Sequence, residues 1–177
     1  MNERQESESQ AILRRRAKRL AQVPPTPDDS LDVIDVILFS LAAEIYAVES
    51  SFVREVYPLK EYTPLPGVPA FVLGIVNVRG QIRSIVNLKI FFDLPAQGLG
   101  QLNKLIILYN DEMEFGILAD EILGAQTLAV AEIQAVPPTV SGVGATYLRG
   151  VTADQVIILD AARLLSDEAI VVFQTVT

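Results

Sequence analysis

Short apolar runs alternate with turn-forming residues along most of this chain. The runs are rich in valine, isoleucine, leucine and phenylalanine, a composition typical of β-strands. Because the strands are short and closely spaced, they predict a mainly β fold built from small β-barrels rather than a doubly wound sheet. The predicted strands are Val33–Leu41, Glu44–Val48, Glu55–Leu59, Val72–Val78, Ile82–Leu88, Lys104–Tyr109, Met113–Leu118, Glu121–Val130, Tyr147–Val151 and Gln155–Leu159.

Helices are expected to be few and short in this β-rich part. Ser50 or Ser51 is predicted to cap the first of them, and Asp160 the last, because short polar side chains bond the free N–H groups of a first turn. The glycine-rich stretch 142–146 follows two prolines and is interpreted as a loop. The predicted helical segments are residues 50–54, 88–92 and 161–165.

Residues 71–91 contain the feature around which the chain is organised. The fourth and fifth predicted strands flank Arg79, Gly80 and Gln81, which predicts a β-hairpin. Gly80 accepts a positive φ without a Cβ clash, as a tight turn requires. The turn places Arg79 at the tip of a hairpin whose two strands are expected to be buried. No catalytic partner for Arg79 is recognisable nearby. We interpret Arg79 as a recognition residue, the alternative being a surface arginine without a role.

The first thirty residues form a separate region by composition. Leucine and alanine recur at helical spacing over residues 7–22, and two prolines then begin a Pro-rich linker over residues 23–30. The sequence thus predicts a basic amphipathic helix with its linker at 1–30 and a folded domain at 31–177. The helix carries a basic cluster of Arg14, Arg15, Arg16, Lys18 and Arg19.

This basic cluster has two interpretations. It forms a solvated helix face, as most charge runs do, or it docks on an acidic partner, on the acidic remainder of the chain, or on an anionic membrane surface. The apolar stripe of the helix is narrow, which argues against insertion into a membrane.

The chain contains no cysteine and no histidine. Their absence excludes disulfides, thiolate nucleophiles, Ser-His-Asp triads, and metal sites built on histidine or cysteine. No apolar run reaches the ~18 residues that span a bilayer, and the charged N-terminus is unlike a signal peptide, so a cytoplasmic protein is expected.

Charge is distributed unevenly along the chain. The net charge is −8, yet residues 1–30 hold six basic and five acidic groups and sum to +1. The other 147 residues hold 8 basic and 17 acidic groups and sum to −9. A body this acidic repels phosphate backbones, so proteins rather than nucleic acids are the expected partners.

No catalytic or cofactor-binding arrangement is recognisable. Asp111, Glu112 and Glu114 lack the spacing of a calcium loop and are interpreted as a solvated turn. Asp120 follows an apolar strand without a second convergent acid, and a structural role bonded to backbone or to an arginine is expected. The sequence therefore predicts no catalytic residue, no metal and no cofactor.

The central hairpin and its surroundings carry short motifs in a fixed order. The hairpin itself has GIVNVRG at 74–80 and IVNL at 85–88. In this order the motifs resemble those of the CheW family of chemotaxis coupling proteins, over about residues 33–166. The other matching segments are Ile37–Val48, Val53–Val56, Thr63–Pro66, Pro69–Phe71, Gly116–Asp120, Tyr147–Gly150 and Ile158–Asp160.

The resemblance implies a fold of two intertwined five-stranded SH3-like barrels. It also implies a non-catalytic adaptor that couples the cytoplasmic tips of methyl-accepting chemotaxis receptors to the regulatory domain of a CheA-type histidine kinase, in chemotaxis, another taxis or pilus motility. Such an adaptor is cytoplasmic and recruited to membrane-associated receptor arrays. Carried over by position, the receptor-binding residues are Val53, Glu55, Asn77, Val78, Arg79 and Gly80.

The second strand of the hairpin departs from the family pattern. Arg83 and Ser84 stand where the family has an aliphatic residue and a proline, and Asn87 and Lys89 replace an aspartate and an arginine. Partner specificity is expected to differ at Arg83, Ser84 and Asn87. A regulatory or competitor module that binds the kinase without a receptor is the alternative, and an enzyme using carboxylates is a third hypothesis.

Overall fold

The computed structural model describes residues 32–95, 104–138, 140 and 142–171. The predicted N-terminal helix, its basic cluster and the Pro-rich linker lie outside these residues. The chain divides into two units at residue 31, and the description that follows concerns the second, Asp32–Thr177.

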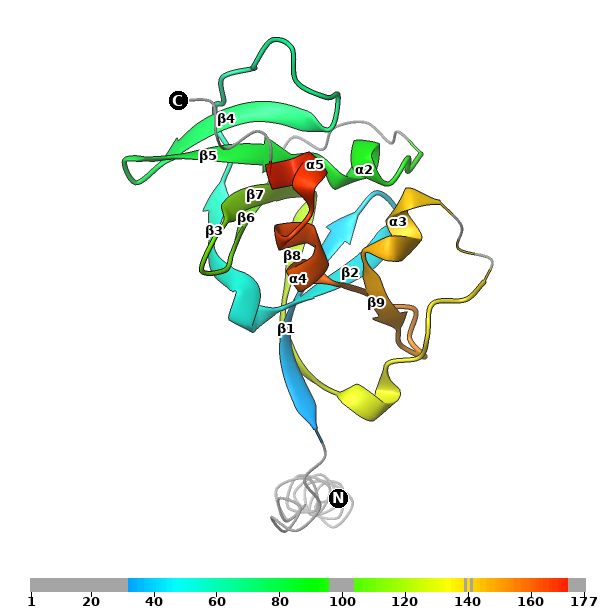
Figure 1. Ribbon diagram of the computed structural model, residues 1–177. Helices are drawn as coiled ribbons and strands as arrows, with labels where there is room; N and C mark the ends of the chain where they lie inside the picture. Colours follow the sequence, from blue (N-terminus) through cyan, green and yellow to red (C-terminus); the bar gives the residue numbers. More distant parts are fainter. Residues whose placement is uncertain (1–31, 96–103, 139, 141, 172–177) are drawn as a thin grey trace, which may run out of the picture. The chain divides into compact units, whose positions relative to one another are not determined.

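The described residues form two five-stranded sheets (Figure 1). The order of the first sheet is β8-β1-β2-β10-β9, and that of the second is β3-β6-β7-β5-β4. The first sheet contains β1 (Val33–Leu41), β2 (Glu44–Glu49), β8 (Glu121–Ala129), β9 (Leu148–Val151) and β10 (Ile157–Leu159). The second contains β3 (Val53–Pro58), β4 (Val72–Val78), β5 (Gln81–Val86), β6 (Lys104–Tyr109) and β7 (Glu114–Ala119).

Short helices join these strands. The first connection between the sheets is made by η1, and α4 and α5 follow the last strand. The helical segments are η1 (Ser50–Phe52), α2 (Leu88–Phe91), η2 (Val130–Glu132), α3 (Val143–Thr146), α4 (Ala161–Leu165) and α5 (Glu168–Val171).

The path of the chain confirms the prediction of two intertwined subdomains. After β1 and β2 the chain leaves the first sheet, forms all five strands of the second, and returns with β8, β9 and β10. A single residue, Asp120, separates β7 of the second sheet from β8 of the first. The first sheet is therefore built from two segments far apart in sequence, with the whole second sheet inserted between them.

Strand pairing does not close either sheet into a barrel, which corrects that part of the prediction. In the described residues each pair of sheet edges is joined by one isolated bridge. Thr63, beyond the end of β3, pairs with Ile75 of β4, and Gln134, beyond the end of β8, pairs with Val151 of β9. The sheets are thus open, with one bridge of two backbone hydrogen bonds where a closed barrel would have a full ladder.

The core consists of one large cluster shared by both sheets and a smaller cluster belonging to each. Strand β6 shows how the period of two builds this arrangement. Ile106 and Leu108 point into the shared cluster, while Leu105 and Ile107 point into the cluster of the second sheet. This explains why β6 is a continuous apolar run without polar alternation. Helices α4 and α5 complete the shared cluster with Ala161, Leu164, Leu165 and Ile170.

Two of the short helices begin at a side-chain cap, and the cap predicted at Asp160 was confirmed. Asp160 caps α4 by accepting the Arg163 N–H at 3.0 Å. At Gly124 the φ is +129°, and the β1–β8 register shifts between Leu38, which pairs with Gly124, and Phe39, so β8 contains an irregularity at this glycine. Asn87 caps α2 by accepting the Lys89 N–H at 3.0 Å, so β5 ends at Val86 rather than at the predicted Leu88.

Other local predictions were wrong. Glu49 is the N-cap of η1 and makes no side-chain cap bond, so neither Ser50 nor Ser51 caps it. The stretch interpreted as a loop at 142–146 contains α3, whose Gly144 lies against the Phe92 ring. Helix α5 was not predicted. Asp167 directly precedes it and accepts a hydrogen bond from the Tyr147 hydroxyl. Burial, together with this hydrogen bond, raises the pKa of Tyr147 to about 12.

Candidate functional site

The tip of the β4–β5 hairpin is a two-residue turn. Val78 pairs with Gln81, so Gln81 belongs to β5 and only Arg79 and Gly80 lie between the strands. Both have positive φ, +52° and +85°, as a type I′ turn requires. Asn77 stabilises this turn by accepting the Gly80 N–H through its side-chain oxygen at 2.8 Å. The turn thereby fixes the direction in which Arg79 leaves the hairpin.

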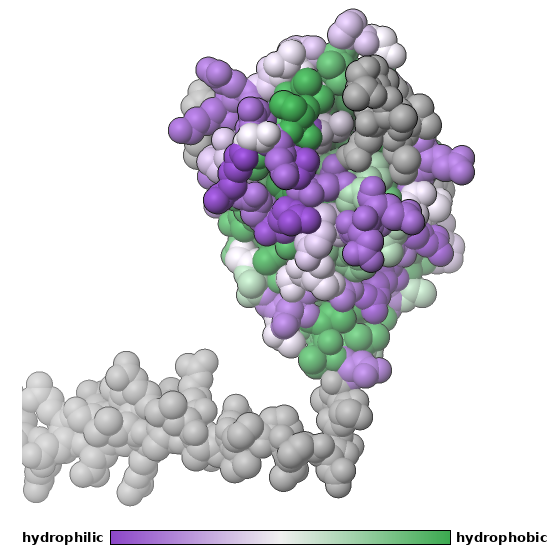
Figure 2. Space-filling model, turned by 60° about the vertical axis from the view of Figure 1, so that its left-hand side comes forward, coloured by the Kyte–Doolittle hydropathy of each residue, from purple (hydrophilic) through white to green (hydrophobic). Residues whose placement is uncertain are grey.

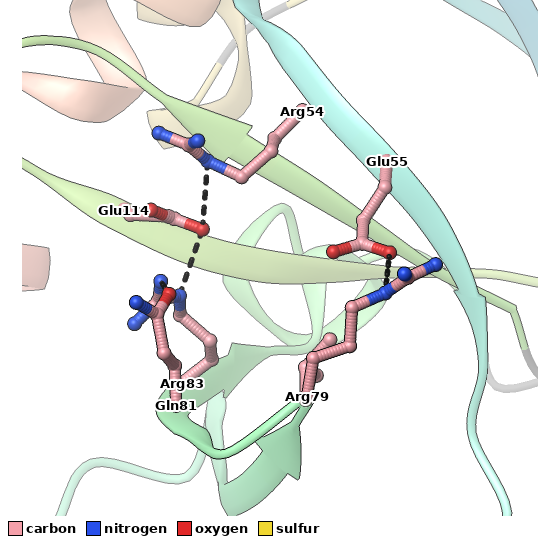
Figure 3. A pocket seen from close by; sticks show the side chains of 7 residues that line it. Arg54, Glu55, Arg79, Gln81, Arg83 and Glu114 are labelled. Carbon is pink, nitrogen blue, oxygen red and sulfur yellow. Dashed lines mark hydrogen bonds and ion pairs between the residues drawn. The ribbon is translucent and has the colours of Figure 1, made fainter.

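Arg79 meets Glu55, which lies on the edge strand β3. The Arg79 Nε donates to the Glu55 Oε2 at 3.0 Å (Figure 3). The arginine side chain is 79% exposed and the glutamate 25%, so this is a surface ion pair with a supported carboxylate. Two of the predicted receptor-binding residues are therefore in contact.

A second ionic cluster lies beside this pair. Glu114, at the start of β7, accepts from the Arg54 Nε at 3.1 Å and from the Arg83 Nε at 2.8 Å. The Arg54 guanidinium also stacks on the Tyr109 ring, 4.3 Å from its centroid. Glu114 was interpreted as part of a solvated turn, and this was wrong, because its side chain is only 17% exposed and is shared by two arginines.

Together these residues line one open pocket, which we call the charged pocket. Its volume is about 510 Å³. Figure 2 turns the side with β3 and the hairpin tip toward the viewer and shows strongly hydrophilic side chains gathered there. The lining residues are Arg54, Glu55, Val78, Arg79, Gln81, Arg83 and Glu114.

The predicted receptor-binding residues take different positions around this pocket. Glu55, Val78 and Arg79 line it, although the Val78 side chain is 95% buried in the core of the second sheet. Asn77 and Gly80 shape the turn, and Asn77 also lines a neighbouring pocket. Val53 packs against the shared core. The structure thus brings Glu55 and Arg79 together in the lining of the pocket, while Val53 and Val78 pack against the core.

A β-bulge explains why Arg54 was missed as a site residue. Neighbouring residues on a regular strand point to opposite faces, so Glu55 in the pocket would place Arg54 outside it. The β3–β6 register instead shifts between Val53 and Glu55, and both Arg54 and Glu55 line the pocket. Bulges redirect side chains in this way, and sequence periodicity does not reveal them. Arg83 was predicted to affect partner specificity, as a departure from the family pattern, but was not named among the receptor-binding residues.

Asp120 lies apart from the charged pocket and has the structural role predicted for it. Its carboxylate accepts the Ala42 N–H at 2.9 Å and the Lys89 Nζ at 2.6 Å. The cation is thus a lysine rather than the expected arginine. Asn87 is 7% exposed, so it acts as a helix cap and offers little surface to a partner.

Among the described residues no group of three acidic side chains is placed to hold a metal ion. None of the described helices is long and apolar enough to cross a membrane.

Comparison with known proteins identifies the family. The CheW-like domain family matches residues 35–169. The chain therefore belongs to the CheW-like family, as its motifs indicated. Its fold agrees with that of a solved scaffolding protein, TtCheW from Thermoanaerobacter tengcongensis, with a TM-score of 0.68 and 26% identity over 78% of this chain and 96% of that one.

Two curated relatives indicate the range of the family around this chain. The chemotaxis protein CheW of Treponema pallidum is 29% identical over 154 residues, which cover 83% of this chain and 89% of the relative. The protein PilI of Pseudomonas aeruginosa is 26% identical over 136 residues, covering 77% of this chain and 76% of the relative.

Proposed function

We propose that the protein is a non-catalytic adaptor that couples the cytoplasmic tip of a methyl-accepting receptor to the regulatory domain of a CheA-type histidine kinase. Membership of the CheW-like family supports the class of function. The observation that carries the receptor half is the Glu55–Arg79 pair, held at 3.0 Å on the rim of the charged pocket. The pathway is chemotaxis or a related taxis or pilus system, and the protein works in the cytoplasm at receptor arrays.

Recognition of the receptor follows a helix-in-groove mode. The receptor tip is a helical hairpin, and its polar face meets the charged pocket while Glu55 and Arg79 set the register. Val78 and Val53 hold the strands that carry these charges. Because the pocket is open and shallow, it accepts a segment of protein surface rather than enclosing a small ligand.

Recognition of the kinase uses the first sheet. An apolar patch formed by Leu38, Ile45, Leu123 and Val156 lies in another pocket of about 530 Å³. Ile45 is 41% exposed and Leu123 is 45% exposed, and neighbouring exposed apolar side chains are characteristic of protein interfaces. We assign this patch to the kinase regulatory domain, so the two partners bind different sheets and can be held at the same time.

A three-component capture experiment tests the adaptor function. Immobilised receptor-tip fragment is expected to retain the kinase regulatory domain only when this protein is present. Ile45→Glu is expected to abolish capture of the kinase domain while leaving this protein bound to the tip. Val143→Glu is the matched control, because Val143 is also exposed (60%) but lies outside the patch.

Two other outcomes of the capture experiment would contradict the adaptor function. A folded protein that binds the kinase domain but never the receptor tip is a competitor module, which contradicts the adaptor. Binding to neither fragment excludes both functions.

A further inference from the structure

The charged pocket concentrates positive charge on an acidic body. Residues 31–177 contain eight basic side chains, and three of them, Arg54, Arg79 and Arg83, line this one pocket. With Glu55 and Glu114 the pocket sums to +1. The same residues 31–177 sum to −9, so the rest of this region sums to −10. A carboxylate of a partner is repelled by most of this surface and attracted here.

The two arginines that share Glu114 are not equivalent. The Arg83 side chain is 17% exposed and its donors are engaged, Nε with Glu114, Nη1 with the Ile82 carbonyl at 3.2 Å and Nη2 with the Gln81 side chain. Arg83 is therefore a largely buried arginine that neutralises the charge of Glu114. Its position on β5 holds that carboxylate at the floor of the pocket.

Of the two arginines that share Glu114, Arg54 is the accessible one. Its side chain is 49% exposed, and within the described residues its guanidinium bonds Glu114 through Nε and stacks on Tyr109. Because one carboxylate is shared by two arginines, this cluster has a surplus positive charge at Arg54. The planar guanidinium is held by the ring, which suits it for a directed bond to a carboxylate.

We propose that Arg54 is a specificity residue, and that the docking helix of the receptor tip presents an Asp or Glu side chain that bonds its Nη end. This inference rests on the proposed receptor-binding function and names the chemistry of the partner at that site. Glu55 and Arg79 set the register, and Arg54 selects a receptor with an acidic side chain at the facing position. The bulge in β3 and the arginine at position 83 together create this selectivity.

Charge reversal tests the proposal with a matched control. The affinity of the full chain for the receptor-tip fragment is measured by calorimetry at about 0.05 M and 0.5 M salt. Arg54→Glu is expected to weaken binding at least tenfold at low salt and much less at high salt, because a rim charge acts mainly through screened attraction. Arg149→Glu, on the other sheet and with similar exposure (38%), is expected to change the affinity less than twofold.

Reciprocal substitutions identify the partner group. Each acidic residue of the tip fragment is replaced singly by Arg, and one of these fragments is expected to bind Arg54→Glu at least tenfold better than the unaltered fragment does. Arg54→Gln keeps the proposal testable if the reversed charge disturbs folding, with an expected loss of about threefold to tenfold.

Two results overturn the proposal in different ways. If the tip binds the unaltered protein, and Arg54→Glu and Arg149→Glu bind equally well, the role of Arg54 is excluded while the adaptor function stands. If the tip does not bind the unaltered protein at all, the receptor-binding function fails and the proposal fails with it.

Discussion

At the scale of single residues, Asp120 ties the two sheets together. Its carboxylate bonds Lys89 of α2, next to the second sheet, and the N–H of Ala42, in the β1–β2 turn of the first. Its own N–H donates to the Ser40 carbonyl at 3.0 Å. The Lys89 and Asp120 side chains are 12% and 23% exposed, so the pair is largely shielded from water. Removing one member of a shielded pair lowers the stability of the fold more than removing one member of a surface pair, because the remaining charge is left shielded from water and unpaired.

Lys89→Met is therefore expected to lower the free energy of unfolding by about 1–3 kcal/mol, because it leaves the Asp120 carboxylate shielded without its cation. Chemical denaturation followed by circular dichroism measures this loss. Arg149→Met is the control, since the Arg149–Glu49 pair is more exposed (38% and 30%) and is expected to contribute no more than about 1 kcal/mol. Equal losses in the two variants would contradict the linking role of Asp120.

Some of the site residues could be predicted from the sequence and others could not. Glu55 and Arg79 were both expected at one site, because the family resemblance marks both and a glycine turn marks Arg79, and they are in contact. The Arg54–Glu114–Arg83 cluster was not expected, since it depends on a bulge in β3 and on the position of β7, neither of which leaves a periodic signal.

At the scale of elements, two glycines explain how each sheet is held at its edges. A Cβ on Gly74 would lie 2.2 Å from the Thr63 carbonyl oxygen, and one on Gly150 would lie 2.3 Å from that of Gln134. Each glycine neighbours an isolated bridge, Thr63–Ile75 or Gln134–Val151. The glycines of both family motifs thus permit a close backbone approach where a sheet edge meets a loop.

Gly150→Ala is expected to lower the free energy of unfolding by about 1–3 kcal/mol, because the methyl group meets backbone that must move and the Gln134–Val151 bridge is lost. Hydrogen exchange is expected to show faster exchange at the Gln134 and Val151 amides. Gly144→Ala is the control, because the three atoms nearest its methyl group would all belong to the Phe92 side chain, the nearest at 3.3 Å, rather than to backbone. Unchanged exchange at the bridge would exclude this explanation.

Strands were easier to predict than helices for a physical reason. Strand runs such as β6 are marked by apolar residues that enter one core or the other, a signal carried by each residue itself. Helices α3 and α5 are only four residues long, and segments this short are stabilised by packing rather than by propensity. The sequence around them therefore gives no sign of a helix, whereas α4 was predicted through its capping Asp160.

At the scale of the whole described domain, the two sheets share one core and carry separate surfaces. The second sheet bears the charged pocket, and the first bears the apolar patch at Ile45 and Leu123. Because the shared cluster packs residues of both sheets against α4 and α5, the two surfaces are fixed relative to each other. This arrangement suits a scaffold that must hold two partners in a defined geometry.

We propose that the Glu55–Arg79 pair serves recognition rather than stability. An ion pair whose arginine is 79% exposed contributes no more than about 1 kcal/mol to folding. Arg79→Ala and Glu55→Lys are therefore expected to leave the melting temperature within about 4 °C of the unaltered protein. If the pair sets the register of the receptor helix, the same variants lose affinity for the receptor tip.

The most direct test is the dissociation constant of the receptor-tip fragment for these two variants, with the melting temperature measured on the same samples. Both variants are expected to bind the receptor tip at least tenfold more weakly and the kinase regulatory domain at unaltered affinity. Unaltered receptor affinity in folded variants, or a large loss of stability in place of a loss of binding, would contradict it.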